Sequence, residues 1–472
     1  MFTKTPYLLL VAPLAVFAED NPIIQTPAPV FFEQTPADVL PSETIQPPKP
    51  AAPVHSDGLS GQSLEARISQ AVRQQNWADL EPLLTQYRLQ NGHDPILYDY
   101  ALGALRRSQL RHQEAVSLYR GIVGQQPDLA YPRFDLGVML FENKQYREAA
   151  AELQRAKPDL QPAMQQFANK YLEAIDKAQG WQPELSFQYE QTDNVNNASD
   201  AKTIEFAGKT WQKTADSLPH QAHGIRYGLG IAREANIGGH HFAHVDLSGS
   251  GVHYWDNQDY NEQSLNLAAG YKNHTAMRSF GLVPFVAQNW LGGARYSRSV
   301  GTNAEFSRRL NNKWRVNVNA AYIWKHYQDE NLAQRYNSTM PYLGATLIYA
   351  APKNWLLYGG ADWSHDMTKE AEQASVRKGL RLGVLKSFAN GFGLRTNLRY
   401  TRRTFDAPGT LIYKFTRKDH EYQANAAVWH RKISWKGFTP NLNFRHLNID
   451  SNMKGFYSRK SNEWFISVEK AF

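Results

Sequence analysis

The sequence of 472 residues contains no cysteine, so it can form no disulfide, no thiolate nucleophile and no zinc site of the cysteine type. No stretch approaches the roughly 18 apolar residues of a transmembrane helix. The nucleotide-binding, hydrolase and metalloprotease motifs GxxxxGK[ST], GxSxG and HExxH are also missing. We therefore expect a protein that is not an enzyme and that uses no metal and no cofactor.

A strong excess of one charge is likewise missing. The formal net charge is +8, and the 52 basic and 44 acidic residues are spread along the chain. Proteins that bind nucleic acid usually concentrate basic residues on one face or stripe. We therefore expect no nucleic-acid partner.

Aromatic residues, by contrast, are abundant. They make up 12% of the chain, although the mean hydropathy is only −0.56. A soluble protein would bury so many aromatic rings, whereas a membrane β-barrel displays them, because each strand has one apolar and one polar face. The composition thus favours an outer-membrane barrel.

The N-terminal segment has the features of a secretory signal. Lys4 precedes an apolar stretch from Tyr7 to Phe17, and Val16-Phe17-Ala18 is an acceptable cleavage site. We predict a signal peptide over residues 1–18. Residues 19–61 are rich in proline and lack hydrophobic periodicity, which predicts an extended linker.

Residues 62–180 have a helical hydrophobic period and one internal repeat. Leu102-Gly103 recurs 34 residues later as Leu136-Gly137, and Ala115 recurs as Ala149 at the same offset. A small residue in the first helix and an alanine in the second are typical of tetratricopeptide (TPR) repeats. An ordinary helical hairpin pair is the alternative. We also predict a degenerate first helix pair at residues 64–89 and a closing helix at residues 162–178.

A concave TPR surface can bind an extended polypeptide through side chains of the first helix of each repeat. Packing of Phe134 and Phe141 against the neighbouring repeat is an equal alternative. The candidate cargo-binding residues are Tyr100, Arg107, Tyr131, Phe134 and Phe141.

Residues 181–472 change to a period of two. In the clearest segment, residues 314–325, apolar side chains alternate with Arg315, Asn317, Asn319 and Lys325, and Ile323 is the exception. Segments of about ten such residues can cross a bilayer as tilted strands. A soluble β-sandwich is the alternative. We count fourteen segments, which begin near Glu184, Gly224, His241, Gln263, Phe280, Thr302, Lys313, Met340, Asn354, Val376, Phe392, His420, Ser434 and Asn462.

The connections between these segments are expected to alternate in length. Tight turns follow most even strands, for example at residues 311–312 and 431–432, and longer loops follow the odd strands, led by residues 191–222. Outer-membrane barrels have short periplasmic turns and long external loops. This places both barrel ends and the repeat domain in the periplasm. The sequence thus predicts an α plus membrane β fold, with TPR-like helices followed by a 14-stranded antiparallel transmembrane β-barrel.

Basic residues recur on the faces that should point into the barrel. They could guide a polar cargo, or they could pair with Asp246, Glu305 or Asp362 in a hydrated lumen. The principal candidates are Arg315, Arg381, Arg395 and Arg399, with Arg226, Arg309, Lys325 and Arg445 on the same faces.

Three neighbouring histidines are the strongest candidates for metal ligands. On a strand, His240 and His244 share a face but lie about 13 Å apart, and His241 points the other way. This spacing suits a single ion poorly. We therefore interpret them as turn and lumen histidines.

Two motifs connect the chain to a known family. The segment Asp193-Asn194-Val195-Asn196-Asn197-Ala198 follows the first strand, and the last strand ends in Phe472 behind alternating Trp464, Ile466 and Val468. A terminal aromatic residue resembles the signal that the barrel-assembly machinery reads. With the signal peptide, the TPR pair and the barrel, the DNVNNA-type segment resembles the surface lipoprotein assembly modulator (Slam) family.

The resemblance implies an outer-membrane translocator without ATP, inserted among outer-membrane lipids by the barrel-assembly machinery. Its partner would be a specific cargo, either a surface lipoprotein or a soluble secreted protein. A TPR-barrel polysaccharide exporter and a passive porin are the alternatives. The domains expected are 1–18 (signal), 19–61 (linker), 62–180 (periplasmic helices) and 181–472 (barrel).

Overall fold

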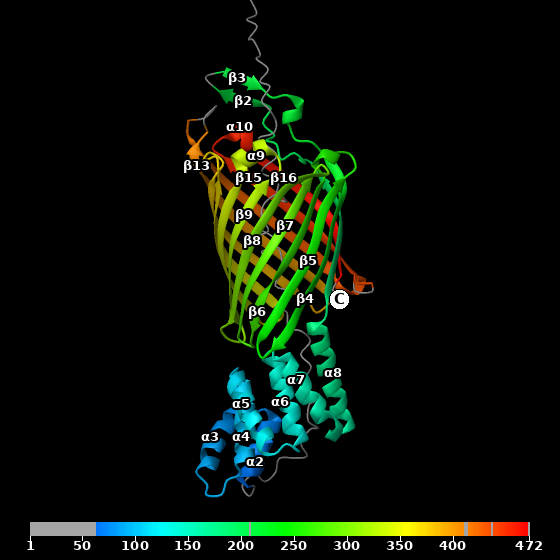
Figure 1. Cartoon of the computed structure of the whole chain (residues 1–472), viewed down its shortest axis with the longest axis vertical. Coiled ribbons are helices and arrows are strands. Elements are labelled where there is room, and N and C mark those ends of the chain that lie inside the picture. Colours follow the sequence, from blue (N-terminus) through cyan, green and yellow to red (C-terminus); the bar gives the residue numbers. More distant parts are fainter. Residues whose placement is uncertain (1–62, 207–208, 410–413, 436–437, 471–472) are drawn as a thin grey trace, which may run out of the picture.

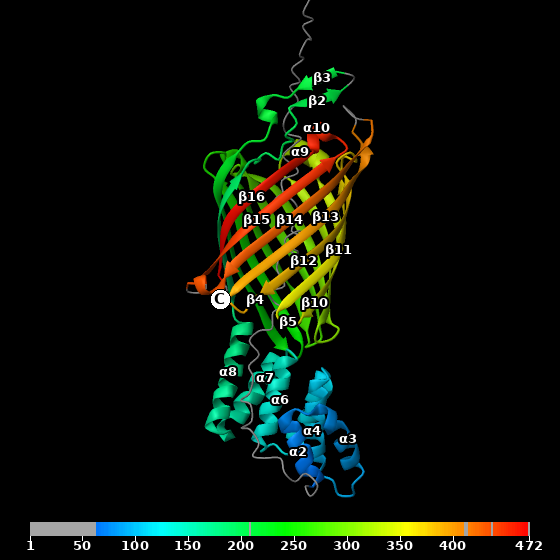
Figure 2. The same cartoon turned by 180° about the vertical axis from the view of Figure 1, so that it is seen from behind.

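The computed structural model describes residues 63–206, 209–409, 414–435 and 438–470. A helical region leads directly into a closed barrel and lies at one end of it (Figures 1 and 2). The predicted signal peptide, the proline-rich linker and Phe472 lie outside the described residues.

Seven α-helices lie between residues 63 and 180, the N-terminal part of the chain that the structure describes. Capping side chains start several of them: Ser63 accepts a hydrogen bond from the Ala66 N–H, and Asp94 accepts one from the Ile96 N–H just before Pro95. The helices are α2 (Leu64–Gln74), α3 (Trp77–Arg88), α4 (Pro95–Ser108), α5 (His112–Gln125), α6 (Ala130–Glu142), α7 (Tyr146–Ala156) and α8 (Pro162–Gln179).

The 34-residue repeat is confirmed by equivalent contacts. A Cβ atom on Gly103 would lie 2.5 Å from the Tyr119 ring, and one on Gly137 would lie 2.7 Å from Cγ of Leu153. Each glycine therefore lets the two helices of one repeat approach closely. The turns between them are also equivalent, since Leu110 and Lys144 have φ of 62° and 64°. The predicted first helix pair and closing helix are both present.

Fourteen antiparallel strands close the barrel, as predicted. The first barrel strand pairs with the last, and each of the remaining barrel strands pairs with the barrel strands before and after it in the sequence. β2 (Thr203–Phe206) and β3 (Lys209–Gln212) form a separate hairpin. The barrel strands are β1 (Gln182–Thr192), β4 (Ala222–Gly238), β5 (His241–Tyr254), β6 (Glu262–His274), β7 (Arg278–Leu291), β8 (Ala294–Arg309), β9 (Trp314–Tyr327), β10 (Ser338–Ala351), β11 (Trp355–Thr368), β12 (Ser375–Ser387), β13 (Phe392–Pro408), β14 (Thr416–His430), β15 (Phe438–Ser451) and β16 (Arg459–Lys470).

Two details of the predicted connections are wrong. β8 begins at Ala294 instead of near Thr302, because Gly292 and Gly293 both have positive φ and make a tight turn where a longer loop was expected. The connection after β14 is longer than the expected turn at residues 431–432. A 3-10 helix, Arg431–Ile433, occupies this connection and β15 begins at Phe438.

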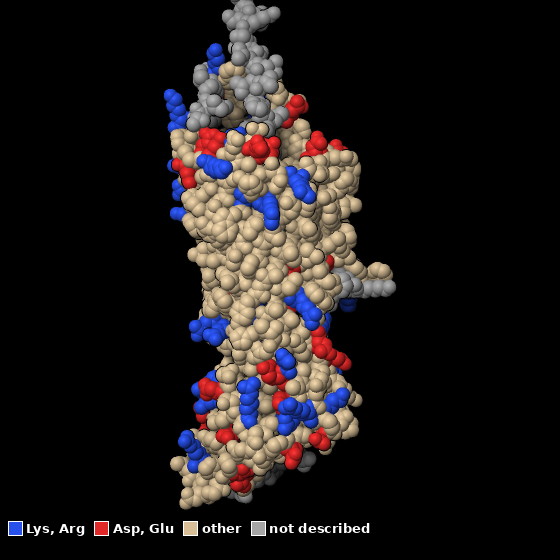
Figure 3. All heavy atoms as spheres, viewed as in Figure 1, with Lys and Arg blue, Asp and Glu red and all other residues tan. Residues whose placement is uncertain are grey.

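The two faces of the strands are as the alternation predicts. On β9, Tyr322 and Trp324 are exposed on the outer face, whereas Ile323 is 1% exposed and points inward. On the face seen in Figure 3, the middle of the barrel is almost free of charged residues, between charged regions at its two ends. This middle zone is the surface that hydrocarbon would cover. Across the described ranges, no helix has the length and apolarity to cross a membrane.

Candidate functional site

The helical region packs into the mouth of the barrel. Tyr146, at the start of α7, contacts Phe242 of β5 edge to face, with ring centroids 5.8 Å apart. Phe242 is 2% exposed and belongs to the same hydrophobic cluster as the cores of α5 to α8. It also contacts the His274 ring at 4.9 Å. One apolar core therefore continues from the repeats into the barrel.

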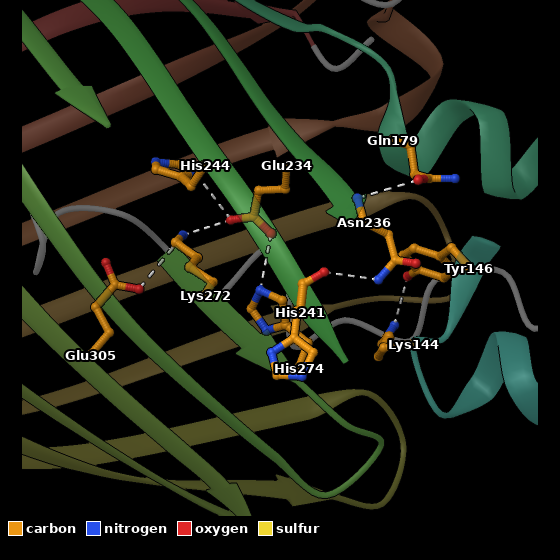
Figure 4. A network of polar contacts seen from close by, with 10 residues as sticks. All are labelled: Lys144, Tyr146, Gln179, Glu234, Asn236, His241, His244, Lys272, His274 and Glu305. Atoms are coloured by element: carbon orange, nitrogen blue, oxygen red, sulfur yellow. Dashed lines mark hydrogen bonds and ion pairs between the residues drawn. The ribbon is translucent and has the colours of Figure 1, made fainter. Parts of the chain in front are cut away.

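Polar contacts fix the orientation of this junction (Figure 4). Asn236, near the end of β4, accepts a hydrogen bond from the Arg147 N–H at 3.1 Å, and its own N–H donates to Gln179 at 3.3 Å. The Gly239 N–H donates to the Glu148 carboxylate at 2.7 Å. Because these contacts involve both α7 and the end of α8, the helical region is held at two points.

A charged cluster lies inside the barrel beside the junction. Glu234 of β4 accepts a hydrogen bond from Lys272 at 2.6 Å, and its carboxylate lies 3.3 Å from His244 and 3.1 Å from His274 (Figure 4). His244 is thus a lumen histidine, as interpreted from the sequence. Among the described residues, no group of three histidine or acidic side chains is arranged to hold a metal.

The predicted lumen cations Arg381 and Arg399 converge on one carboxylate. Arg399 donates to Asp362 at 2.8 Å, and Arg381, which is 5% exposed, lies 3.7 Å from Asp362 and donates to Thr346 at 2.9 Å. Arg315 and Arg395 lie half-buried on the inward faces of β9 and β13. The contacts of Asp362 agree with the alternative in which the lumen arginines pair with acidic residues.

A second ionic cluster lies toward the opposite mouth, and three of its carboxylates were missed from the sequence. Arg226 binds Glu190 through two hydrogen bonds, Tyr254 donates to Glu190 at 2.7 Å, and Arg445 pairs with Glu463 at 3.1 Å. Glu262 is 2% exposed nearby. Two of these carboxylates, Glu190 and Glu463, could have been found from the sequence, because they occupy inward-facing positions of strands whose neighbours carry inward-facing arginines.

The five candidate cargo-binding residues differ in accessibility. Phe134 is 4% exposed and packs on Tyr171 of α8, which Phe141 also contacts, with ring centroids 5.4 Å apart. These contacts agree with the alternative in which Phe134 and Phe141 pack against a neighbouring helix instead of binding cargo. Tyr131, in contrast, is 45% exposed.

Tyr100 and Arg107 bond to the next repeat. Tyr100 donates to Asp135 at 3.0 Å, and Arg107 makes a bidentate contact with Glu142. Burial raises the pKa of the Asp135 carboxyl to about 6. Both pairs have the same sequence offset, close to the repeat length, and this spacing could have revealed Asp135 and Glu142.

The DNVNNA segment forms an ordered turn at the opposite mouth. The Asn194 side chain bonds both the N–H and the carbonyl of Ala198 at 2.8 Å, and the Val195 N–H donates to the His220 carbonyl at 2.8 Å. Val195 packs into a buried cluster with residues of β4 and β5. The segment therefore ties the first loop to the inside of the barrel rim.

Comparison with known proteins gives matches over both regions. The family model of the surface lipoprotein assembly modifier matches residues 181–472, and that of its N-terminal TPR repeats matches residues 60–154. A surface lipoprotein assembly modifier of Pasteurella multocida is 28% identical, covering 90% of this chain and 89% of its own.

Two further relatives have different names. Surface lipoprotein assembly modifier 1 of Haemophilus influenzae is 27% identical, covering 85% of this chain and 83% of its own. A hemophilin secretion modulator of Acinetobacter baumannii is 25% identical, covering 85% and 84%.

Proposed function

Since the chain belongs to the surface lipoprotein assembly modifier family, we propose that it delivers a specific polypeptide from the periplasm to the cell surface or the medium. Relatives are named for surface lipoproteins and for hemophilin, so the cargo class is a lipoprotein or a soluble secreted protein. The protein is an outer-membrane barrel, and the transport role includes no catalytic step.

The observation that carries the proposal is the shared core at the junction. Tyr146 and Phe242 join the repeats to the barrel, and Asn236 and Gly239 bond α7 directly. A passive pore has no use for a helical module fixed at its entrance. A module that binds a chain there raises the local concentration of that chain at the lumen.

The two regions then have separate tasks. Residues 62–180 bind the cargo in the periplasm, after residues 1–18 have directed export and residues 19–61 have served as a spacer. Residues 181–472 provide the passage, inserted among outer-membrane lipids by the barrel-assembly machinery. Within the helical region, Tyr131 is the candidate with the most accessible side chain, and Tyr100, Arg107, Phe134 and Phe141 support the surface around it.

The lumen residues determine the polarity of the passage. Arg381 and Arg399 are held by Asp362, so they present a fixed polar wall and not two independent cations. Arg315 and Arg395 extend that inward surface on β9 and β13. Such a wall favours a hydrated polypeptide over an apolar solute.

The test compares surface display of candidate cargoes by antibody labelling of intact cells. Deleting residues 62–180 should leave an inserted barrel with little or no display. Tyr131→Ala should reduce display, whereas Leu89→Ala, at a side chain 81% exposed on another helix pair, is the matched control. A porin would keep its conductance and have no cargo to lose. A polysaccharide exporter would lose surface sugar instead, and normal display after the deletion would refute translocation.

A further inference from the structure

The seam between the first and last strands is unlike the other strand interfaces of the barrel. Among the described residues, β1 and β16 pair at three positions, Ser186 with Glu469, Phe187 with Val468 and Gln188 with Ser467. On its other side, β1 pairs with β4 along all of Gln182–Thr192. β1 is therefore a regular strand, and the missing backbone pairs are confined to its interface with β16.

The unpaired part lies toward the mouth opposite the helices. Residues 189–192 of β1 and 459–466 of β16 are all described, and none of them pairs across the seam. In the same stretch β16 is fully paired with β15, for example through Ile466 and Leu442. Two regular strand edges thus face each other there without a ladder.

Four side chains beside the unpaired stretch make their hydrogen bonds, ion pairs or ring contacts with strands on their own side of the seam. On the lumen face, Glu190 of β1 bonds to Arg226 and Tyr254, whereas Glu463 of β16 pairs with Arg445. On the outer face, Tyr189 contacts Trp255 at 6.1 Å and Trp464 contacts Phe444 at 4.6 Å. Each of these contacts ties a seam strand to neighbouring strands on its own side, so none of them bridges β1 and β16.

External segments bridge the end of the seam. Ser199, just after the DNVNNA segment, donates to the Lys454 carbonyl at 3.3 Å, and Gly455 lies against Ile204 of β2. Lys454 and Gly455 belong to the short helix α10 (Lys454–Tyr457), between β15 and β16. In the described part of the chain, the seam is therefore held by three ladder pairs nearer the helices and by loop contacts at the opposite mouth.

The chemistry of the two sides indicates what could pass. The lumen side is charged, while large apolar side chains flank the seam outside: Phe187, Tyr189, Trp464 and Ile466 are 49%, 49%, 64% and 58% exposed. Backbone groups in hydrocarbon must be hydrogen-bonded, so an incomplete ladder is the interface that separates most easily. An acyl chain is poorly accommodated among charges and is well accommodated against this apolar outer surface.

We propose that the β1–β16 seam is a lateral exit through which the acylated end of a lipoprotein cargo leaves the barrel for the outer leaflet. This rests on the proposed function, because it requires a polypeptide in the lumen. A cargo without an acyl group has no need of the seam and leaves through the open mouth. The seam thus separates the two cargo classes named for the relatives.

The cysteine-free sequence allows a direct test by disulfide locking. Tyr189→Cys with Ile466→Cys places a cross-link at the next position of the seam register. The control, Leu442→Cys with Ile466→Cys, cross-links two directly opposite residues of the complete β15–β16 ladder on the same outer face. The probes are one candidate surface lipoprotein, expressed together with the parent chain, and the same protein with its lipoprotein signal replaced by a secretory signal that is cleaved without acylation.

With the seam oxidised, display of the acylated probe should fall at least tenfold and recover after reduction. Release of the non-acylated probe should match the parent chain, and the control lock should affect neither. Undiminished display through a fully formed seam cross-link would overturn the lateral exit, as would equal loss of both probes. Failure of the unmodified chain to display the acylated probe would instead refute the proposed function, and the exit with it.

A second measurement tests the proposal even if the cysteine pair does not form a disulfide. A photoreactive residue at position 189 should capture the acylated probe during export, whereas one at Leu347, 43% exposed on the opposite wall strand β10, should not. Capture at neither position, or equally at both, would contradict the proposal.

Discussion

Asp135 shows how one buried carboxyl group influences the helical region. Burial raises the pKa of Asp135 to about 6, against the opposing effects of the Tyr100 hydrogen bond and the Arg107 charge. The folded state therefore holds the proton more tightly than the unfolded chain does. The carboxylate destabilises the fold above about pH 6, and this penalty disappears as the pH falls toward the ordinary value of 3.8.

Asp135→Asn should remove this dependence, because the amide oxygen can still accept the Tyr100 hydrogen bond but does not ionise. At pH 8 we expect the free energy of unfolding of the helical region to rise by on the order of 3 kcal/mol, since each pKa unit corresponds to about 1.4 kcal/mol. At pH 4 the difference from the parent should nearly vanish. Circular dichroism at 222 nm during thermal unfolding of the full chain in detergent measures both values.

Burial lowers the pKa of His112 in the same region, which has the opposite effect on stability as the pH falls. His112 is unchanged in both proteins, so the difference between them isolates Asp135. The exposed Asp128→Asn is the control and should give no pH-dependent difference. A gain for Asp135→Asn that was equal at pH 4 and pH 8 would show that desolvation of the carboxylate is not its cause.

At the scale of elements, each TPR helix pair depends on a close approach at one glycine. The Tyr119 ring beside Gly103 is 1% exposed and donates a hydrogen bond to the Tyr100 carbonyl, so it cannot easily move. Gly103→Ala should cost about 1–3 kcal/mol through overpacking, more than the gain of about 1 kcal/mol in helix propensity.

Gly121→Ala is the matched control on α5. Nothing lies within 4 Å of a Cβ atom at that position, so only the gain in helix propensity should remain. Urea unfolding of the helical signal should place the midpoint of Gly103→Ala below the parent and that of Gly121→Ala above it. The same sign for both variants would mean that the helix contact does not constrain Gly103.

The stability of the inserted barrel depends on which side chains of each strand face lipid and which face the lumen. Val318 of β9 shares a face with the exposed Tyr322 and Trp324, whereas Asn317 accepts a hydrogen bond from Ser307 in the lumen at 2.7 Å. Val318→Arg should therefore cost about 2–4 kcal/mol near the bilayer midplane, and Asn317→Arg should be mild. Folding into lipid vesicles across a urea series measures both, and equal costs would contradict the assigned facing.

The elements were largely predictable because their signals are local. Alternation along residues 314–325 identifies β9, and the recurrence of Gly103 as Gly137 identifies the repeat. The error at the start of β8 arose because the turn before it depends on backbone dihedrals. At Gly292-Gly293 two positive φ values allow the chain to reverse immediately, and composition alone does not distinguish this from the start of a loop.

At the scale of the whole molecule, the sequence located the candidate lumen cations but not the junction. Arg381 and Arg399 were identifiable because their strands alternate, and Asp362 was named among their possible partners. The contact between Tyr146 and Phe242 joins two regions that have different periods and are far apart in sequence. No local pattern indicates such a contact, and the same holds for Asn236 and Arg147.

Phe242 should determine whether the helical region is fixed or only tethered to the mouth. Its ring is the barrel's contribution to the core of the repeats, so Phe242→Ala should remove about 3–5 kcal/mol of packing at the junction. The barrel itself should remain closed, because the backbone pairing of β5 with β4 and β6 does not involve the ring. The control is Phe285→Ala, which truncates a phenylalanine buried in a separate cluster.

Spin labels at Leu89→Cys and Ile433→Cys, both exposed and in a cysteine-free background, report the position of the helices relative to the barrel. The distance distribution should be narrow in the parent and in Phe285→Ala, and broad in Phe242→Ala. An unchanged narrow distribution in Phe242→Ala would mean that the polar contacts alone hold the junction. Since the helices end at Gln179 and β1 begins at Gln182, even a released helical region stays close to the mouth. Cargo would still be concentrated there but presented in many orientations, so Phe242→Ala should lower display several-fold, while deletion of the helical region abolishes it.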